Sequence, residues 1–247
     1  MMRGLRSAAL VVGAIVFAMQ ASCAQDDEPN TAVDRGREVA SSTKVSPSRG
    51  NVLSCTSCHR MDPAERPTAI LPGATLAGVT LRKAFWGGEE LDLLRSINQC
   101  RYFFMAANEP WLASDPSAVD LYAYLQSLEP LAQGALREQV PFTVVREVRD
   151  VPAQPTGGDQ IYDRACRNCH GAPHTAQGRP RPSTPLLPED AITSHEYLKS
   201  RDATRLVFIE KVRHGGFLGY GGLMPPFSLE AMTDAELGAL LSFLGLY

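Results

Sequence analysis

The chain has no surplus of basic residues, and this absence excludes one large class of partners. Its 24 Lys and Arg residues are outnumbered by 27 Asp and Glu residues, which gives a formal charge of −3. Nucleic acids and anionic membrane surfaces attract proteins with a positive surface, so we expect neither as a partner. Beyond the N-terminus, the sequence also lacks an apolar run of the roughly 20 residues that a membrane-spanning helix needs. The remaining composition, with 44% apolar residues, is typical of a globular protein.

The six cysteines are few, but four of them fall into a repeated pattern. Each copy has two cysteines three positions apart and a histidine directly after them: Cys55, Cys58 and His59, then Cys166, Cys169 and His170. Cys-x-x-Cys-His is the attachment signature of c-type haem. The two thiols add to the two vinyl groups of the haem, and the histidine is held under the iron as its proximal ligand. The sequence therefore predicts two covalent haem c groups.

Other interpretations of the cysteines explain less of the pattern. A zinc site could combine Cys55 and Cys58 with Cys166 and Cys169, but both histidines would then have no role. A thioredoxin-like redox pair needs a βαβ context, and no alternating β-branched runs flank either motif. Disulfides are possible in an exported chain, but they require no histidine after each pair.

The N-terminus carries the pattern of a signal peptide over residues 1–24. Arg3 and Arg6 precede an apolar run over residues 8–19, and small residues follow it. Because haem is attached to c-type cytochromes outside the cytoplasmic membrane, export and the haem motifs agree, and we expect a periplasmic protein. Cleavage after residue 24 would release it in soluble form, and cleavage before Cys23 would leave a lipid anchor. Removal of the first 24 residues lowers the formal charge to −5.

A methionine in the second half of the chain is a candidate for the distal iron ligand. Met224 lies 54 residues after His170, between two glycines and two prolines. Glycines allow the backbone to approach a haem, and the prolines stiffen the loop. A thioether ligand opposite histidine raises the reduction potential. We therefore expect His170 and Met224 to ligate one iron.

The distal ligand in the first half is less well defined by the sequence. Met105 lies 46 residues after His59 and is the favoured ligand. Cys100 lies five residues earlier and is the alternative, and an open iron is a third arrangement. Cys100 would be the unpaired thiol of a chain cleaved after residue 24, and a small buried side chain is its simpler interpretation.

The sequence predicts an all-α protein made of two tandem cytochrome c-like domains, each enclosing one haem. The helix patterns include an apolar face within residues 89–105, a proline-initiated helix from Asp115, and a capping box at Thr233. The expected organisation is a signal peptide over 1–24, domain 1 over 25–130, a connector over 131–155, and domain 2 over 156–247. A short extended piece at 141–145 is expected to lie across the two domains.

The chain resembles the class I c-type cytochromes in dihaem form. The resemblance rests on the two Cys-x-x-Cys-His motifs, on the loop at Met224, and on the leucine- and tyrosine-rich terminal helices. The first half departs from that pattern, because it has an insertion before its haem motif and no Met-Pro pair. A fainter likeness, on residues 97–100 with Met105 and on residues 141–145, is to the dihaem thiosulfate dehydrogenases and the Sox cytochromes. In those families a cysteine thiolate takes part in thiosulfate chemistry at one haem.

Two functions follow as expectations. The first is a carrier of single electrons between redox proteins or membrane respiratory complexes, which has no catalytic residue. The alternative is an oxidoreductase for a small sulfur anion such as thiosulfate, with the first haem and Cys100 as the reaction site. Four basic residues near Cys100 could then attract the anion: Arg82, Lys83, Arg95 and Arg101.

Overall fold

The computed structural model describes residues 31–64, 68–134, 141–218 and 222–247. The expected signal peptide and Cys23 lie outside them. Within the described residues, the regular structure is helical, with one isolated bridge between Phe85 and Glu90. None of the helices in this part of the chain has the length and apolarity needed to cross a membrane.

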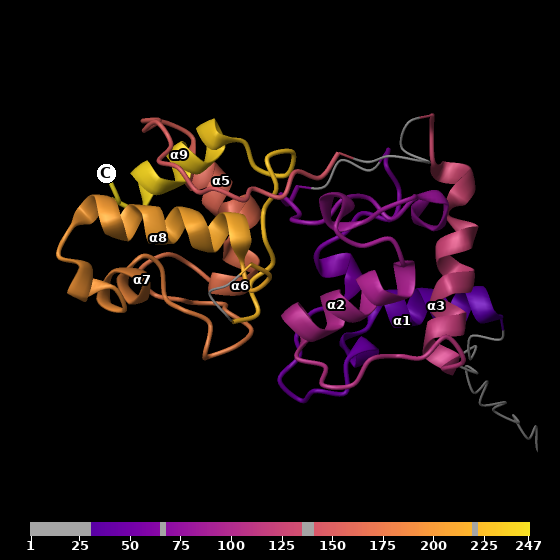
Figure 1. The fold of residues 1–247 in the computed structure, drawn as a ribbon. Helices are drawn as coiled ribbons and strands as arrows, with labels where there is room; N and C mark the ends of the chain where they lie inside the picture. The colour runs from indigo at the N-terminus through magenta and orange to yellow at the C-terminus, as the bar shows by residue number, and fades with distance from the viewer. Residues whose placement is uncertain (1–30, 65–67, 135–140, 219–221) are drawn as a thin grey trace, which may run out of the picture.

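The helices form two groups that lie side by side, joined by the chain around residues 141–157 (Figure 1). The N-terminal group consists of α1 (Ala32–Ser41), η1 (Thr43–Val45), η2 (Cys55–Ser57), η3 (Val79–Leu81), η4 (Trp86–Gly88), α2 (Leu93–Met105), α3 (Pro116–Ser127) and η5 (Glu129–Leu131). The C-terminal group consists of α5 (Gly158–Ala165), α6 (Arg167–His170), α7 (Glu189–Thr193), η6 (Glu196–Leu198), α8 (Arg201–His214) and α9 (Asp234–Phe243).

Local sequence signals explain where several helices begin. The α2 helix begins at Leu93 because the Asp92 side chain accepts a hydrogen bond from the Arg95 N–H. The α3 helix begins at Pro116, whose missing N–H costs nothing at the first helical position. The α9 helix begins after Thr233, whose hydroxyl and the Glu236 carboxylate form the expected capping box. These starts agree with the sequence patterns, except that α2 begins four residues after position 89.

A glycine allows two helices to cross at very short range in each group. In the N-terminal group α1 packs on α3, and a Cβ at Gly36 would overlap the Asp120 carbonyl and the Cβ of Tyr124. In the C-terminal group α5 packs on α9, and a Cβ at Gly158 would overlap the Ala239 carbonyl. The Cβ of Phe243, four residues after Ala239, is the next obstacle, just as Tyr124 is four residues after Asp120. The same crossing thus occurs twice in the chain.

Replacement of Gly158 by alanine is expected to destabilise the protein by roughly 3 kcal/mol, because the added methyl group must push α5 away from the α9 backbone. The free energy of unfolding in urea measures this effect. Gln160→Ala is the matched control, since Gln160 is exposed on the same helix. Equal stability of the two variants would contradict the close crossing.

The apolar core is divided in the same way as the helices. The largest cluster of buried side chains is built from residues 151–246, with one residue from the first half, Ile70. Two smaller clusters lie in the first half, one between α1 and α3 and one around Phe104 and Met105 at the end of α2. Ile70 therefore ties the loop after the first motif to the core of the other group.

Candidate functional site

In the first motif, a single helical turn brings the two cysteines and the histidine together. The His59 N–H donates to the Cys55 carbonyl at 2.9 Å, and the Cys58 N–H donates to the same carbonyl at 3.1 Å. Ser54 caps this turn, since its N–H donates to the Ser57 hydroxyl at 3.0 Å. The turn therefore brings the two thiols and the imidazole of the first motif together on one short stretch of backbone.

A backbone carbonyl fixes the orientation of the His59 ring. Its Nδ1 lies 2.7 Å from the Ala74 carbonyl, which can only accept, so Nδ1 carries the proton and Nε2 keeps a free lone pair. This is the second-sphere contact that usually orients a metal-binding histidine. A Cβ at Gly73 would overlap the ring. Burial lowers the pKa of His59, which keeps the imidazole neutral and able to bind a metal.

The second motif repeats these contacts on α6. The His170 N–H donates to the Cys166 carbonyl at 2.9 Å, and its Nδ1 lies 2.9 Å from the Pro185 carbonyl. In both motifs, the carbonyl that orients the ring comes 15 residues after the histidine. Burial also lowers the pKa of His170. Both imidazoles therefore present a neutral Nε2 on the side away from the carbonyl.

A cavity of about 570 Å³ opens over the first motif. Cys55, Cys58 and His59 line it, and both Cys100 and Met105 reach it from α2. Its volume falls within the range of roughly 300–1,000 Å³ that is typical of small-molecule and cofactor pockets. Met105 is buried among aromatic and aliphatic side chains, and its carbonyl accepts a 2.7 Å hydrogen bond from Ser46. The structure therefore brings both candidate distal ligands to the cavity.

Two donors in this cavity have no partner among the residues that the structure describes. The Nε of Arg82 and the Nε1 of Trp86 are buried without a hydrogen bond, and both side chains line the cavity. Buried donors are normally satisfied, so these two indicate a bound group with acceptors. A haem supplies such acceptors as its two propionates. The residues around the first motif therefore fit a haem.

The other basic residues expected near Cys100 have different surroundings. Arg101 lies over the Trp111 ring and donates to the carbonyls of Val45 and Glu109, so its guanidinium is held by the protein. Arg95 is exposed and pairs with Glu90 at 3.2 Å. Lys83 lines the cavity together with Arg82.

The thiols themselves remain unpaired with each other. None of the five described cysteines forms a disulfide bond: Cys55, Cys58, Cys100, Cys166 and Cys169. Among the described residues, no three His, Cys, Asp or Glu side chains gather in a way that could hold a metal ion. Burial raises the pKa of the Cys100 thiol, with smaller effects from Cys58 and Cys55, and this favours the protonated form.

Met224 lies in a loop over residues 222–227, which we call the ligand loop. The Gly216 N–H donates to the Met224 carbonyl at 2.7 Å, and a Cβ at Gly215 would overlap that carbonyl. The Met224 side chain is half-buried and packs against the cluster that contains Cys166. The structure thus places Met224 and the second motif against the same core.

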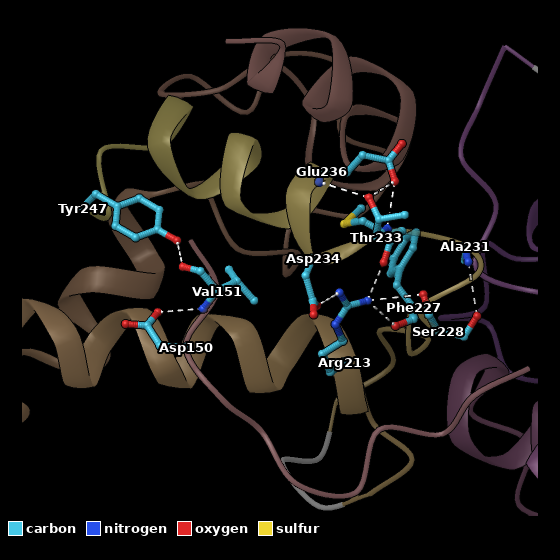
Figure 2. Close-up of polar contacts among 11 residues, drawn as sticks. Asp150, Val151, Arg213, Phe227, Ser228, Ala231, Thr233, Asp234, Glu236 and Tyr247 are labelled. Atoms are coloured by element: carbon cyan, nitrogen blue, oxygen red, sulfur yellow. Dashed lines mark hydrogen bonds and ion pairs between the residues drawn. The ribbon is translucent and has the colours of Figure 1, made fainter. Parts of the chain in front are cut away.

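The contacts of Arg213 hold the chain directly after the ligand loop, and sequence patterns alone did not indicate this residue. Figure 2 shows its buried guanidinium pointing from α8 into a turn of carbonyls. It donates to the carbonyls of Phe227, Ser228 and Met232 at 3.2, 3.2 and 2.6 Å, and to the Asp234 carboxylate at 2.6 Å. Arg213 therefore connects the end of the ligand loop to the start of α9.

Replacement of Arg213 by methionine is expected to destabilise the protein by about 3 kcal/mol, because three buried carbonyls lose their donor. The sequence-based expectation that Met224 ligates iron implies a long-wavelength methionine-to-iron absorption band, and the variant should weaken that band because the loop that carries Met224 would be less well held. Urea unfolding and visible spectroscopy measure the two effects. Arg201→Met, an exposed position at the other end of α8, is the control. A stable variant with an unchanged band would refute this positioning role.

Comparison with protein families identifies the C-terminal part of the chain. Residues 153–244 match the family of cytochrome c oxidase, cbb3-type, subunit III. No curated protein matches the chain. The matched segment contains the second motif, Met224, Arg213 and the α5–α9 crossing. Residues 153–244 are therefore a cytochrome c domain, the class of domain that binds haem c covalently and transfers electrons.

Proposed function

We propose that the protein is an exported dihaem c-type cytochrome that passes single electrons between redox partners. One observation carries the proposal: each motif histidine donates through Nδ1 to a carbonyl 15 residues later, so both imidazoles are prepared in the same way to bind iron. The family match at residues 153–244, which contain His170, supports the second site. The geometry at His59 is the reason to assign a haem to the first.

The repeated helix crossing supports a second cytochrome c-like domain in the N-terminal half. In each half, a helix glycine lies against a backbone carbonyl and against the Cβ four residues after it. These residues are Gly36, Asp120 and Tyr124 in the first half, and Gly158, Ala239 and Phe243 in the second. The glycines precede their motifs by different lengths, 19 residues before Cys55 and 8 before Cys166, which reflects the insertion in the first half. In this proposal the domains are residues 25–130 and 156–247, with 131–155 between them.

The chain's own residues set the conditions for electron transfer. Cys55 and Cys58 would hold one haem and Cys166 and Cys169 the other, with His59 and His170 as proximal ligands. A haem supplies an iron that cycles between the ferric and ferrous forms. Met224 and Met105 are the proposed distal ligands, and their thioether sulfur favours the ferrous form. The apolar side chains around each site exclude water and keep the surrounding dielectric low.

We further propose export through the signal peptide at residues 1–24, to the periplasm, with Cys23 as a lipid anchor if cleavage precedes it. The partners would be redox proteins or a membrane respiratory complex. The name of the matched family, an oxidase subunit, makes a terminal oxidase one reasonable electron acceptor.

The alternative, oxidation of a small sulfur anion at the first site, needs a reactive thiolate at Cys100. Arg82 and Lys83 line the cavity and would attract an anion. Burial raises the pKa of the Cys100 thiol, which favours its protonated form. The cytochrome c domain at residues 153–244 supports electron transfer, so we propose electron carriage as the function.

A reductive titration of the purified protein and of Cys100→Ala tests this choice. We expect both proteins to take up two electrons per chain with the same midpoints, because Cys100 serves as a packed side chain and the irons turn over no substrate. The extent of reduction is measured by visible absorbance against added reductant. Uptake of one electron per chain would contradict the dihaem proposal. If thiosulfate reduced the wild-type protein but not Cys100→Ala, the result would favour the alternative function.

A further inference from the structure

The cavity over the first motif is lined by residues from both halves of the chain. Besides Cys58 and His59, its lining includes Pro225 and Pro226. These prolines follow Met224 directly, so the loop that carries the proposed ligand of one iron also borders the site of the other. The first site is thus completed by the C-terminal group of helices.

An aromatic contact joins the two groups beside these prolines. Phe217 stacks on Trp86, with ring centroids 4.5 Å apart and an interplanar angle of 18°. It also meets Phe103 edge-on at 5.4 Å. Trp86 lines the cavity. On the other side, Gly216, the neighbour of Phe217, donates to the Met224 carbonyl at 2.7 Å. Trp86, Phe217 and Gly216 therefore form a continuous chain of contacts from the cavity to the Met224 backbone.

A second set of contacts brings the two motifs close to each other. The Ile70 N–H donates to the Arg164 carbonyl at 2.8 Å, and the Arg164 Nε donates to the Thr68 carbonyl at 2.9 Å. Arg164 is two residues before Cys166, and Ile70 packs in the same cluster as Cys166. The loop that follows His59 therefore lies against the helix that leads into the second motif.

We propose that the two haems lie on opposite sides of one shared wall, formed by residues 215–217 and 224–226, and that electrons pass directly between the irons across it. The exchange is a one-electron step: the ferrous iron loses the electron that the ferric iron gains. No bond forms or breaks, no proton moves, and no further oxidant is needed. This inference rests on the proposed dihaem function and adds the route between the sites.

Electron paramagnetic resonance of the full-length protein tests the arrangement without any variant. In the fully oxidised protein, both irons are paramagnetic, and we expect faster spin relaxation and broader lines than in the half-reduced protein, where the neighbouring ferrous low-spin iron is diamagnetic. Identical line widths and relaxation in the two samples would overturn the shared wall. The intact mass of the same sample separates the failures: one haem per chain contradicts the proposed function, whereas two haems without spin interaction contradict only this inference.

Two phenylalanine variants test the route itself. Phe217→Ala removes the ring that links the wall to Trp86, so inter-haem exchange after photochemical reduction should be several-fold slower. Phe142→Ala is the matched control, because Phe142 also lines the cavity and meets Trp86 edge-on at 6.1 Å but lies outside the wall. Equal rates in the two variants would exclude Phe217 as part of the route. If Phe217→Ala does not fold, the resonance measurement still decides the arrangement.

Discussion

Replacement of Cys166 and Cys169 by serine should reduce the covalent haem of the purified protein from two groups per chain to one. A serine hydroxyl does not add to a haem vinyl group, so no thioether forms at the second motif. Replacement of Cys55 and Cys58 should remove the other haem, and the fourfold variant should carry none. Intact mass and the absorbance of the alkaline pyridine complex count the haems.

The control for these variants is Cys100→Ser, because Cys100 lines the first cavity but lies outside both motifs. It should keep two haems. If the Cys55 and Cys58 variant also kept two, the first motif would have no role in attachment, and the dihaem proposal would fail while the cytochrome c domain at residues 153–244 remained.

Replacement of Met224 by leucine should abolish the methionine-to-iron band of the second haem and lower its reduction potential. Leucine has a similar volume and no sulfur, so the core packing is largely kept while the ligand is lost. Axial ligands set haem potentials over a range of about 0.8 V, so the decrease should be on the order of tenths of a volt. Visible spectroscopy and a potentiometric titration measure both effects.

Met232→Leu is the matched control for this change. Met232 is buried in the same core, and its carbonyl accepts from Arg213, but it lies outside the ligand loop. It should keep both the band and the potential. If Met224→Leu kept them as well, Met224 would be a packing residue, and another side chain would ligate the iron.

Helices whose ends are set by neighbouring residues were predictable from the sequence. The α3 helix begins at Pro116 and α9 begins after Thr233, as the proline and the capping box predict. The start of α2 was placed too early, because the Glu90 carboxylate accepts from the N–H groups of Leu91 and Asp92 and so holds a turn before the helix. This carboxylate competes locally with helix formation, and apolar periodicity does not reveal that effect.

The candidate ligands could be named from the sequence, because the spacing of cysteines and histidine is a local chemical requirement, and their role as ligands stays a prediction. The contacts that surround them could not be predicted. Arg213 meets carbonyls 14 to 19 positions later in the chain, and Phe217 meets Trp86 from the other half. Such contacts depend on how the helices pack, and nothing in the sequence around either residue specifies its partner. The glycines at the helix crossings gave the only sequence signal that could have indicated close packing.

The chain between the helix groups is bound to both of them. Phe142 meets Trp86, the Val145 carbonyl accepts from His214 at 2.5 Å, and the Thr143 N–H donates to Glu230 at 2.8 Å. Excision of residues 153–244 would remove Trp86, which covers the Phe217 ring, and Ile70, which packs into the C-terminal core. The excised domain would expose both apolar sites and would tend to aggregate. Reuse of this domain as a module in engineered electron-transfer chains would first require polar substitutions on that newly uncovered face.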